Sequence, residues 1–262
     1  MRILLTNDDG IHAEGLASLQ RIAAALSDDA WTIAPEVEQS GMSRALTLGA
    51  PLRVRQAGER AFSVTGTPTD CVMLSKDLLD RAPDLVLSGV NRGQNLAEDC
   101  SLSGTVAGAV MGMAIGVPAI ALSQSLARFH DEVTAHWETA ERHGPGVVQR
   151  LVEIGWPRDV VMNVNFPARP ADEVTEVEVT EQGMHDAFRG HAEKRVDLRG
   201  RPYYWMGFTH AGQEPPKGTD LAAIKAGRIS VTPLHIDMTH RAAMHDLRGK
   251  LGGAVPVLER QA

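Results

Sequence analysis

The chain begins Met1-Arg2-Ile3-Leu4-Leu5-Thr6-Asn7-Asp8-Asp9-Gly10. The apolar run from Ile3 to Leu5 predicts a short buried strand, and the residues after it place two adjacent acids at the carboxyl end of that strand. In open α/β sheets, ligands bind beyond the carboxyl ends of the strands. Two neighbouring carboxylates repel each other, so we expect a cation between Asp8 and Asp9. The opening stretch therefore predicts both the type of sheet and an oxygen-ligand metal site.

Short strands and helices alternate from the start of the chain to about residue 125. Apolar runs predict the strands, and apolar residues at helical spacing or a helix-starting residue predict the helices. The expected strands are residues 2–6, 31–34, 46–54, 61–64, 84–88 and 119–122, and the expected helices begin near residues 15, 68 and 104. Such alternation is typical of the α/β class, and we predict a doubly wound, mostly parallel sheet of the Rossmann-like type.

The second half of the chain has a different pattern. A helix is expected over residues 131–154, with an interruption near Gly144-Pro145-Gly146, and strands are expected at 160–165 and 229–234. Residues 175–208 are polar and favour β-structure, and a last helix is expected to begin near residue 240. We predict that residues 1–125 form an α/β metal- and phosphate-binding core. Residues 126–262 would then supply the remainder of the core, a C-terminal β-rich extension or arm, and the C-terminal helix.

The predicted arm carries a cluster of aromatic residues. Tyr203, Tyr204 and Trp205 lie together in a chain in which aromatic residues make up only 4%. Aromatic side chains are enriched at buried interfaces between proteins. This cluster predicts a homo-oligomer assembled through residues 175–208 and the C-terminal strand and helix. The alternative is that the aromatic residues close a core within one subunit.

Composition narrows the class of protein. The 262 residues carry a net charge of −7 and no basic patch, so we expect no nucleic-acid polymer as a partner. Cys71 and Cys100 are the only cysteines, which fits a reducing cytosol, and the amino terminus does not resemble an export signal. The longest apolar stretch, residues 106–122, is interpreted as a buried helix and a buried strand. A cytoplasmic protein without a membrane partner is therefore expected.

Three polar loops follow three of the predicted parallel strands and are expected to meet at one edge of the sheet. They contain Asp8 and Asp9, then Ser40, then Asn91. Two carboxylates, a hydroxyl and a carboxamide oxygen are ligands that suit Mg²⁺ or Mn²⁺ better than Zn²⁺. The alternative is that the two acids serve as helix-capping or turn residues, although capping needs only one acid. Ser40 and Asn91, taken alone, would be interpreted as turn formers.

A second polar motif, Ser101-Leu102-Ser103-Gly104-Thr105, precedes a helix of small residues. The free N–H groups at such a helix start attract phosphate. The alternative is an ordinary cap in which Ser103 binds the first turn, but a neighbouring metal loop favours phosphate. The chain has no G-x-G-x-x-G, no Walker A loop and no G-x-S-x-G elbow, so common nucleotide-binding loops and the α/β-hydrolase class are not expected.

These motifs occur in one order along nearly the whole chain, and together they closely resemble the survival protein SurE family of metal-dependent 5′-nucleotidases. The segments that carry the resemblance are Asn7-Asp8-Asp9-Gly10, Ala34-Pro35 with Ser40-Gly41, Thr65-Gly66-Thr67-Pro68-Thr69-Asp70-Cys71, Ser88-Gly89-Val90-Asn91-Arg92-Gly93-Gln94-Asn95-Leu96, Ser103-Gly104-Thr105-Val106, Asn163-Val164-Asn165-Phe166-Pro167, Gly200-Arg201-Pro202-Tyr203-Tyr204-Trp205 and Ser230-Val231-Thr232-Pro233-Leu234.

The resemblance implies a set of roles. One divalent cation per subunit, Mg²⁺ or Mn²⁺, would be bound by Asp8, Asp9, Ser40 and Asn91, and the phosphate would be surrounded by Asn95, Ser103, Gly104 and Thr105. The family is cytoplasmic, and its members form homodimers or homotetramers with the help of a C-terminal extension. Asp8 or Asp9 is also the candidate catalytic group that accepts a proton from water, and the sequence does not assign which of the two does so.

The chain departs from the family pattern at three positions that are not proposed ligands. Ala97 stands where Gly is common, Leu102 replaces a usual Tyr or His, and Met111 stands where an acid is usual. The change at Leu102 bears on the preference for base or sugar, because this residue is expected near the pocket.

The predicted function is metal-dependent removal of phosphate from nucleoside 5′-monophosphates, with 3′-nucleotides and polyphosphate as further candidate substrates. Two alternatives remain at this point. One is a phosphatase for a different small monoester, and the other is a non-catalytic nucleotide-binding protein. Release of phosphate from a panel of substrates separates them.

Overall fold

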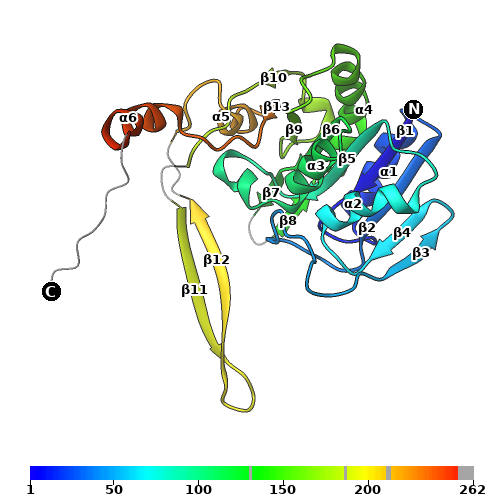
Figure 1. Ribbon diagram of the computed structural model, residues 1–262, viewed down its shortest axis with the longest axis horizontal. Helices are drawn as coiled ribbons and strands as arrows, with labels where there is room; N and C mark the ends of the chain where they lie inside the picture. Colours follow the sequence, from blue (N-terminus) through cyan, green and yellow to red (C-terminus); the bar gives the residue numbers. More distant parts are fainter. Residues whose placement is uncertain (130–131, 186–187, 211–213, 253–262) are drawn as a thin grey trace.

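A nine-stranded sheet forms the centre of the molecule, with strand order β10-β13-β9-β6-β5-β1-β2-β4-β3 (Figure 1). The computed structural model describes residues 1–129, 132–185, 188–210 and 214–252. The strands are β1 (Arg2–Thr6), β2 (Asp29–Pro35), β3 (Val54–Gly58), β4 (Ala61–Val64), β5 (Leu85–Arg92), β6 (Ala119–Gln124), β9 (Val161–Phe166), β10 (Val177–Val179) and β13 (Ile229–Leu234). Neighbours are parallel from β9 through β1 to β4, while β3 and β13 pair antiparallel with β4 and β9. The predicted doubly wound, mostly parallel α/β sheet is confirmed.

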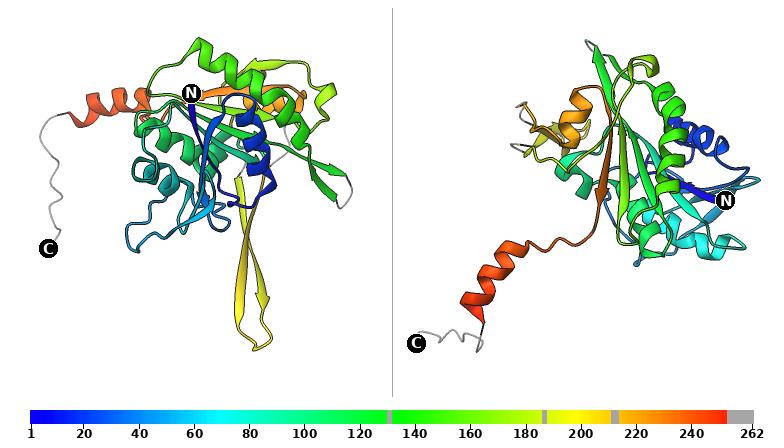
Figure 2. Two further views of the ribbon diagram at one scale, coloured as in Figure 1. Left: turned by 90° about the vertical axis from the view of Figure 1, so that its right-hand side faces the viewer. Right: turned by 90° about the horizontal axis from the view of Figure 1, so that it is seen from above.

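Helices cover both faces of this sheet (Figure 2). The helices α1 (Glu14–Ala24) and α4 (Trp137–Ile154) pack together on one face, and α2 (Pro68–Leu78) and α3 (Gly104–Ala114) pack together on the other. Because successive side chains of a strand point to opposite faces, β1 contributes to two cores. Ile3 and Leu5 pack in the core that includes Leu16 of α1, and Leu4 packs in the core that includes Val72 of α2.

Two local predictions were wrong. Residues 46–54 do not form a strand, and the nearby strand β3 begins only at Val54. This segment is instead bound to the start of α2, where the Thr47 N–H donates to Asp70 Oδ1 (3.0 Å) and the Thr67 hydroxyl donates to the Ala45 carbonyl (2.7 Å). The motif at residues 65–71 therefore both caps α2 and holds the loop that follows Ser40.

The second error concerns α4, which continues through Gly144-Pro145-Gly146. A Cβ atom at Gly144 would lie 2.8 Å from Ile22 Cδ1, so this glycine allows α4 to pack closely on α1. Burial of Ala140 and Val148 on both sides of Pro145 offsets the cost of a proline inside the helix. The helix also starts later than expected, because Glu132–Ala135 forms the strand β8, which pairs with β7 (Leu126–Phe129).

The C-terminal β-rich extension is confirmed. Strands β11 (Phe188–Val196) and β12 (Pro202–His210) form an antiparallel hairpin that projects from the body of the molecule (Figure 1). Tyr203, Tyr204 and Trp205 are 42%, 57% and 60% exposed, so they do not close a core within this chain. The helix α6 (Arg241–Leu251) also projects and has no buried residue. A division of the chain at residue 125 stays a prediction.

The remaining elements are short: the 3-10 helices η1 (Ala97–Ser101) and η2 (Ala171–Glu173), and the helix α5 (Asp220–Lys225). The apolar stretch at residues 106–122 forms most of α3 and the first part of β6, as predicted. Within the described ranges, every helix is too short or too polar to cross a membrane.

Candidate active site

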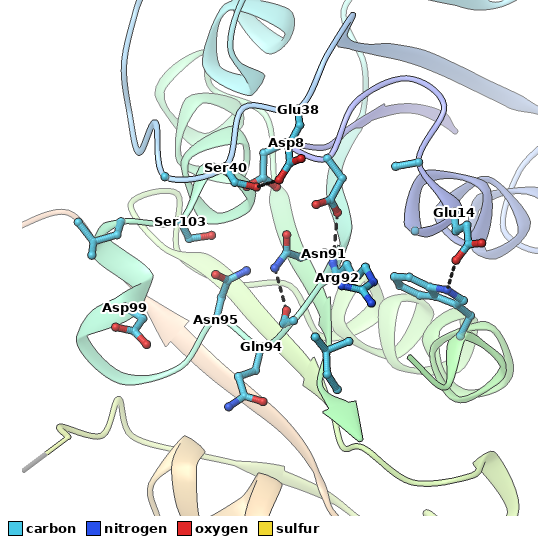
Figure 3. A pocket seen from close by; sticks show the side chains of 18 of the residues that line it. Asp8, Glu14, Glu38, Ser40, Asn91, Arg92, Gln94, Asn95, Asp99 and Ser103 are labelled. Carbon is cyan, nitrogen blue, oxygen red and sulfur yellow. Dashed lines mark hydrogen bonds between the residues drawn. The ribbon is translucent and has the colours of Figure 1, made fainter. Parts of the chain in front are cut away.

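The carboxyl ends of the central strands open into a cavity of about 1010 Å³ (Figure 3). Residues from the end of β1, from the loop after β2 and from the end of β5 with the loop that follows it all line this cavity. Most of the predicted site residues are brought together here, namely Asp8, Asp9, Ser40, Asn91, Asn95 and Ser103. Gly104 and Thr105 are buried and are not among the residues that line the cavity.

The turn at the end of β1 directs the two acids into the cavity. The Asn7 side chain donates from Nδ2 to the Gly10 carbonyl (2.9 Å), and Gly10 has φ +101°, a backbone conformation that favours glycine. The Asp8 carbonyl accepts a hydrogen bond from the Gln39 N–H (2.7 Å). This bond connects the loop that carries Ser40 to the end of β1, so two of the predicted ligand segments are fixed to each other.

Asp8 lies against the first turn of α3. Its Oδ1 accepts a hydrogen bond of 2.5 Å from the hydroxyl of Thr105, which is fully buried. A Cβ atom at Gly104 would lie 2.8 Å from the Asp8 Cβ, so the glycine lets the helix approach this closely. The side chain of Thr105 thus orients Asp8, while the predicted phosphate contact through its backbone N–H stays a prediction.

Asp9 and Asn91 are connected through the end of β5. The Arg92 N–H donates to Asp9 Oδ2 (3.2 Å), and Asn91 donates from Nδ2 to the Gly93 carbonyl (2.8 Å). Because the amide nitrogen of Asn91 is used within its own turn, its carboxamide oxygen is the atom suited to bind a cation. In Figure 3, Asn91 lies between Asp8 and Asn95 within the cavity.

The two acids have raised pKa values. Burial raises the pKa of Asp8 to about 6, and the charges of Asp9 and Glu38 act in the same direction, while the hydrogen bond from Thr105 opposes them. Burial also raises the pKa of Asp9, the charge of Glu38 adds to this effect, and the Arg92 N–H and guanidinium oppose it. Both carboxylates therefore carry a cost of desolvation that a bound cation would relieve.

The donor set fits a divalent metal ion. Asp8 and Asp9 supply carboxylate oxygens, Ser40 a hydroxyl and Asn91 a carboxamide oxygen, all on one cavity. These are hard oxygen ligands, which Mg²⁺ and Mn²⁺ prefer. Across the described residues, no three His, Cys, Asp or Glu side chains gather as a metal-binding group. The neutral oxygens of Ser40 and Asn91 are therefore needed to complete the set.

The part of the cavity predicted to bind phosphate lies at the amino end of α3. Ser103 caps the helix, since its Oγ accepts from the Val106 N–H (3.0 Å), and it also lines the cavity. Capping and phosphate contact are thus compatible. The first N–H groups of an α-helix have no partner within the helix, and in α3 these belong to Gly104 and Thr105. Asn95 faces the same region from the loop between β5 and η1 (Figure 3).

The sequence analysis missed several residues of the cavity. Glu38 lines it and accepts from the Ser40 hydroxyl (2.9 Å). Its position two residues before Ser40, in a loop already selected, was a usable signal. Trp137 lines the opposite part and donates from Nε1 to Glu14 (3.1 Å). Nothing local distinguishes Trp137 in the sequence, because it reaches the cavity only through the packing of α4 beside α1.

Comparisons with known proteins agree with this geometry. Residues 3–189 match the family described as Survival protein SurE. A protein named 5′-nucleotidase SurE from Caulobacter vibrioides (strain NA1000 / CB15N) is 66% identical over 258 residues, which cover 98% of each chain. Another of that name, from Brucella canis, is 53% identical over 260 residues and covers 98% of this chain and 99% of its own.

A solved structure leads to the same family. The crystal structure of the SurE protein from Aquifex aeolicus is 36% identical, superposes with a TM-score of 0.79, and covers 95% of this chain and 99% of its own. An identity of 36% over nearly the whole of both chains is more than a shared fold class. The chain belongs to the SurE family.

Proposed function

We propose that this protein is a metal-dependent phosphomonoester hydrolase, a 5′-nucleotidase that removes phosphate from nucleoside 5′-monophosphates. The observation that carries the proposal is the convergence of the buried Asp8, the partly buried Asp9, a hydroxyl and a carboxamide beside the amino end of α3. The names of relatives that match 98% of this chain support the same activity. Candidate further substrates of the site are 3′-nucleotides and polyphosphate.

In this proposal Asp8, Asp9, Ser40 and Asn91 hold one divalent cation, Mg²⁺ or Mn²⁺, in each subunit. Such a cation neutralises charge on the phosphate and makes water a stronger nucleophile. The Thr105 hydroxyl donates a hydrogen bond to Oδ1 of Asp8, and the Arg92 N–H of β5 donates one to Oδ2 of Asp9. The second oxygen of each carboxylate remains for the cation or for the proton that the attacking water loses, so both acids are candidates for the general base.

The other part of the site binds the phosphate. The N–H groups of Gly104 and Thr105 lie at the positive end of the α3 dipole, and Ser103 and Asn95 add side-chain contacts. This arrangement stabilises the charge that builds up on the phosphoryl oxygens. Backbone N–H groups explain how Gly104 and Thr105 contribute even though their side-chain positions are buried.

The experiment that tests this function measures phosphate release from a substrate panel. The panel contains nucleoside 5′-monophosphates, 3′-nucleotides, ribose 5-phosphate, another small monoester and polyphosphate, each with and without Mg²⁺ or Mn²⁺. We expect the highest kcat/KM with a nucleoside 5′-monophosphate, loss of activity after chelation, and recovery when the cation is added back. Full turnover in excess chelator, with no metal in the protein, would show that the metal assignment is wrong.

The same panel decides between the alternatives. A preference for a non-nucleotide ester identifies a phosphatase with a different substrate. Tight nucleotide binding without phosphate release, in the presence of either cation, identifies a binding protein. The family membership and the cavity would then stand, and the proposed chemistry would not.

We propose a homodimer or homotetramer that assembles through the projecting hairpin, in the cytoplasm. Tyr203 and Trp205 lie on one face of β12, and Tyr204 and Met206, which is 78% exposed, lie on the other, so both faces of the strand expose large apolar groups to water. Light scattering of the purified protein at micromolar concentration tests the assembly. Replacement of the three aromatic residues by serine should reduce the mass of the particle, and a wild-type monomer would contradict the proposal.

A further inference from the structure

A buried asparagine on β9 binds the loop that carries the phosphate side of the site. Asn165 is 0% exposed, and its carboxamide forms two hydrogen bonds with the backbone of Asn95. The Asn95 N–H donates to Asn165 Oδ1 (2.9 Å), and Asn165 Nδ2 donates to the Asn95 carbonyl (3.0 Å). Both polar groups of the Asn95 backbone are thus satisfied by a single side chain, as a neighbouring strand would satisfy them.

Other buried side chains also hold this segment, among them Cys100, whose Sγ donates to the Asn95 carbonyl (3.4 Å). Asn163 Nδ2 donates to the Asn95 carbonyl (2.8 Å), and Asn95 Nδ2 donates to Ser123 Oγ (2.8 Å). Two residues further along, the Ala97 N–H donates to Asp220 Oδ2 (2.8 Å). The loop between β5 and α3 is therefore fixed by side chains from β6, β9 and α5 rather than by strand pairing.

These polar residues occupy positions where apolar side chains are usual. Strands inside a parallel sheet usually consist of nearly continuous apolar residues. In β9, however, Asn163 and Asn165 lie on one face of the strand, and both are buried. Burying a carboxamide costs stability unless it is fully hydrogen-bonded. Asn165 is hydrogen-bonded to Asn95 through both Oδ1 and Nδ2, so its contacts explain the amide at this position. Asn163 contacts Asn95 through Nδ2, while its buried Oδ1 has no hydrogen-bond partner within the described residues.

We propose that Asn165 is a positioning residue for phosphate binding: it holds the Asn95 backbone and so fixes the phosphate-facing loop, without contacting substrate. The proposal rests on the proposed function, because Asn95 is a phosphate contact only if the cavity binds a phosphoester. Asn163 also donates to the Asn95 carbonyl, but only Asn165 in addition accepts from the Asn95 N–H. Asn165 is therefore the residue to test.

The test compares two variants of Asn165 with a matched control, all in the full-length protein. Asn165→Ala removes both hydrogen bonds. Ser230→Ala is the control, because Ser230 is equally buried and is paired with Asn165 across β13 and β9, while its hydroxyl contacts Thr180 (2.8 Å) and not the loop. We expect both variants to lower Tm. Only Asn165→Ala should weaken inhibition by inorganic phosphate and lower kcat/KM, each by at least about tenfold, since small displacements of binding groups have effects of this size.

Asn165→Asp tests the hydrogen-bond pattern with almost no change of volume. As a carboxylate it still accepts from the Asn95 N–H but cannot donate to the Asn95 carbonyl, and when protonated it regains a donor. Burial favours the protonated acid, so the ratio of its phosphate affinity to that of the wild type should rise as the pH is lowered from about 8 to about 6. A purely structural role would leave this ratio constant.

Hydrogen exchange provides a readout that does not depend on activity. Peptides covering residues 91–97 should exchange faster in Asn165→Ala than in the wild type, and at the wild-type rate in Ser230→Ala. If the wild type releases no phosphate, the proposed function fails. Faster exchange and weaker binding of inorganic phosphate in Asn165→Ala would still support the positioning role of Asn165. Unchanged exchange, or an unchanged inhibition constant for phosphate in both Asn165 variants, overturns the inference.

Discussion

The charged groups at the two ends of β1 have opposite surroundings: those at the amino end are paired with opposite charges, and those at the carboxyl end lie next to like charges. At the amino end, the Arg2 side chain is 9% exposed and forms ion pairs with Asp29 (3.0 Å) and Asp80, while its backbone N–H donates to Asp84 (2.6 Å). At the carboxyl end, Asp8 and Asp9 stand next to each other and accept hydrogen bonds from a hydroxyl and a backbone N–H. The strand therefore has a paired charge at Arg2 and two like charges just beyond its other end, the first of them six residues further along at Asp8.

The pKa values record this difference. Hydrogen bonds from Arg2 lower the pKa of Asp29 and of Asp80 below their usual range. Burial raises the pKa of Asp8 and of Asp9. The charges at the amino end are paired within the fold, whereas the like charges at the carboxyl end would be stabilised by the proposed cation. Perturbed acids in a cavity indicate function, and paired acids at the opposite edge indicate stability.

The largest expected effect comes from removing charge at the carboxyl end. Asp8→Asn and Asp9→Asn each take one negative charge from the cation site with almost no change in volume. We expect kcat/KM with a nucleoside 5′-monophosphate to fall by about 10³-fold or more in each variant, since each variant weakens the site of the cation that would stabilise the developing charge. Steady-state phosphate release, with circular dichroism to verify folding, measures this loss.

Asn91→Ala is the graded control for that experiment. It removes a neutral ligand and leaves the charge of the site unchanged, so its effect should be smaller, about 10- to 100-fold. Near-normal turnover in either aspartate variant would place the chemistry elsewhere and remove the contrast between the two ends of the strand.

The second effect is on stability and has an unusual direction. The pKa of Asp8 is about 6 in the folded protein against 3.8 in the unfolded chain, so between these values the folded state binds more protons. Stability of the metal-free protein should therefore fall as the pH rises from about 4 to about 6, by about 3 kcal/mol. Asp8→Asn should remove this loss and be more stable than the wild type at neutral pH without metal.

Denaturant unfolding in chelator, at several pH values, measures this slope. Added Mg²⁺ or Mn²⁺ supplies a further comparison, because a cation that binds the folded state stabilises it by mass action. The cation should raise the free energy of unfolding of the wild type, and it should raise that of Asp8→Asn only slightly. A wild type whose metal-free stability rises over this pH range would contradict the account of Asp8.

The third prediction concerns the amino end and should show the opposite behaviour. Arg2→Met keeps an unbranched side chain but removes the guanidinium that pairs with Asp29 and Asp80, while Asp29 keeps its ion pair with Arg81 (3.0 Å). We therefore expect Tm to fall by several degrees with kcat/KM unchanged. Acids with lowered pKa stabilise the fold above their unfolded pKa and lose that contribution as the pH falls through the folded pKa. The Tm difference from the wild type should therefore shrink below about pH 4. A drop in activity of the folded variant would show that the two ends are coupled.

The contrast also explains what the sequence could predict. Asp8, Asp9, Ser40 and Asn91 were recognised because each lies just after a predicted strand, and the parallel architecture brings such positions to one edge. The rule is local and needs only the strand pattern. The ligand roles of these residues stay a prediction, although the structure brings them to one cavity.

Residues that act through long-range packing gave no such signal. Trp137 lines the cavity from α4, and Asn165 binds the Asn95 backbone from β9. The placement of both residues depends on how the second half of the chain packs on the first. The glycine-proline pair at residues 144–145 was interpreted as a break because the local rule is strong, yet packing of Gly144 on Ile22 decided the outcome. Tertiary contacts override local propensity where burial is extensive.

The smallest expected effect lies in the loop that Asn165 holds. Ala97, which stands where the family commonly has Gly, adopts φ +52° and is fully buried. Glycine would remove a left-handed cost of about 1–2 kcal/mol. It would also lose a buried methyl group worth about 0.8 kcal/mol and gain freedom in the unfolded chain worth about 0.4–1 kcal/mol. These contributions nearly cancel, so Ala97→Gly should change stability by less than about 1 kcal/mol and leave activity unchanged.

Ala97→Val, which adds a β-branched side chain at the same backbone angle, should be clearly destabilising in the same denaturant unfolding experiment. A large effect of glycine in either direction would mean that the loop is held by something other than the polar contacts described for Asn95 and Ala97.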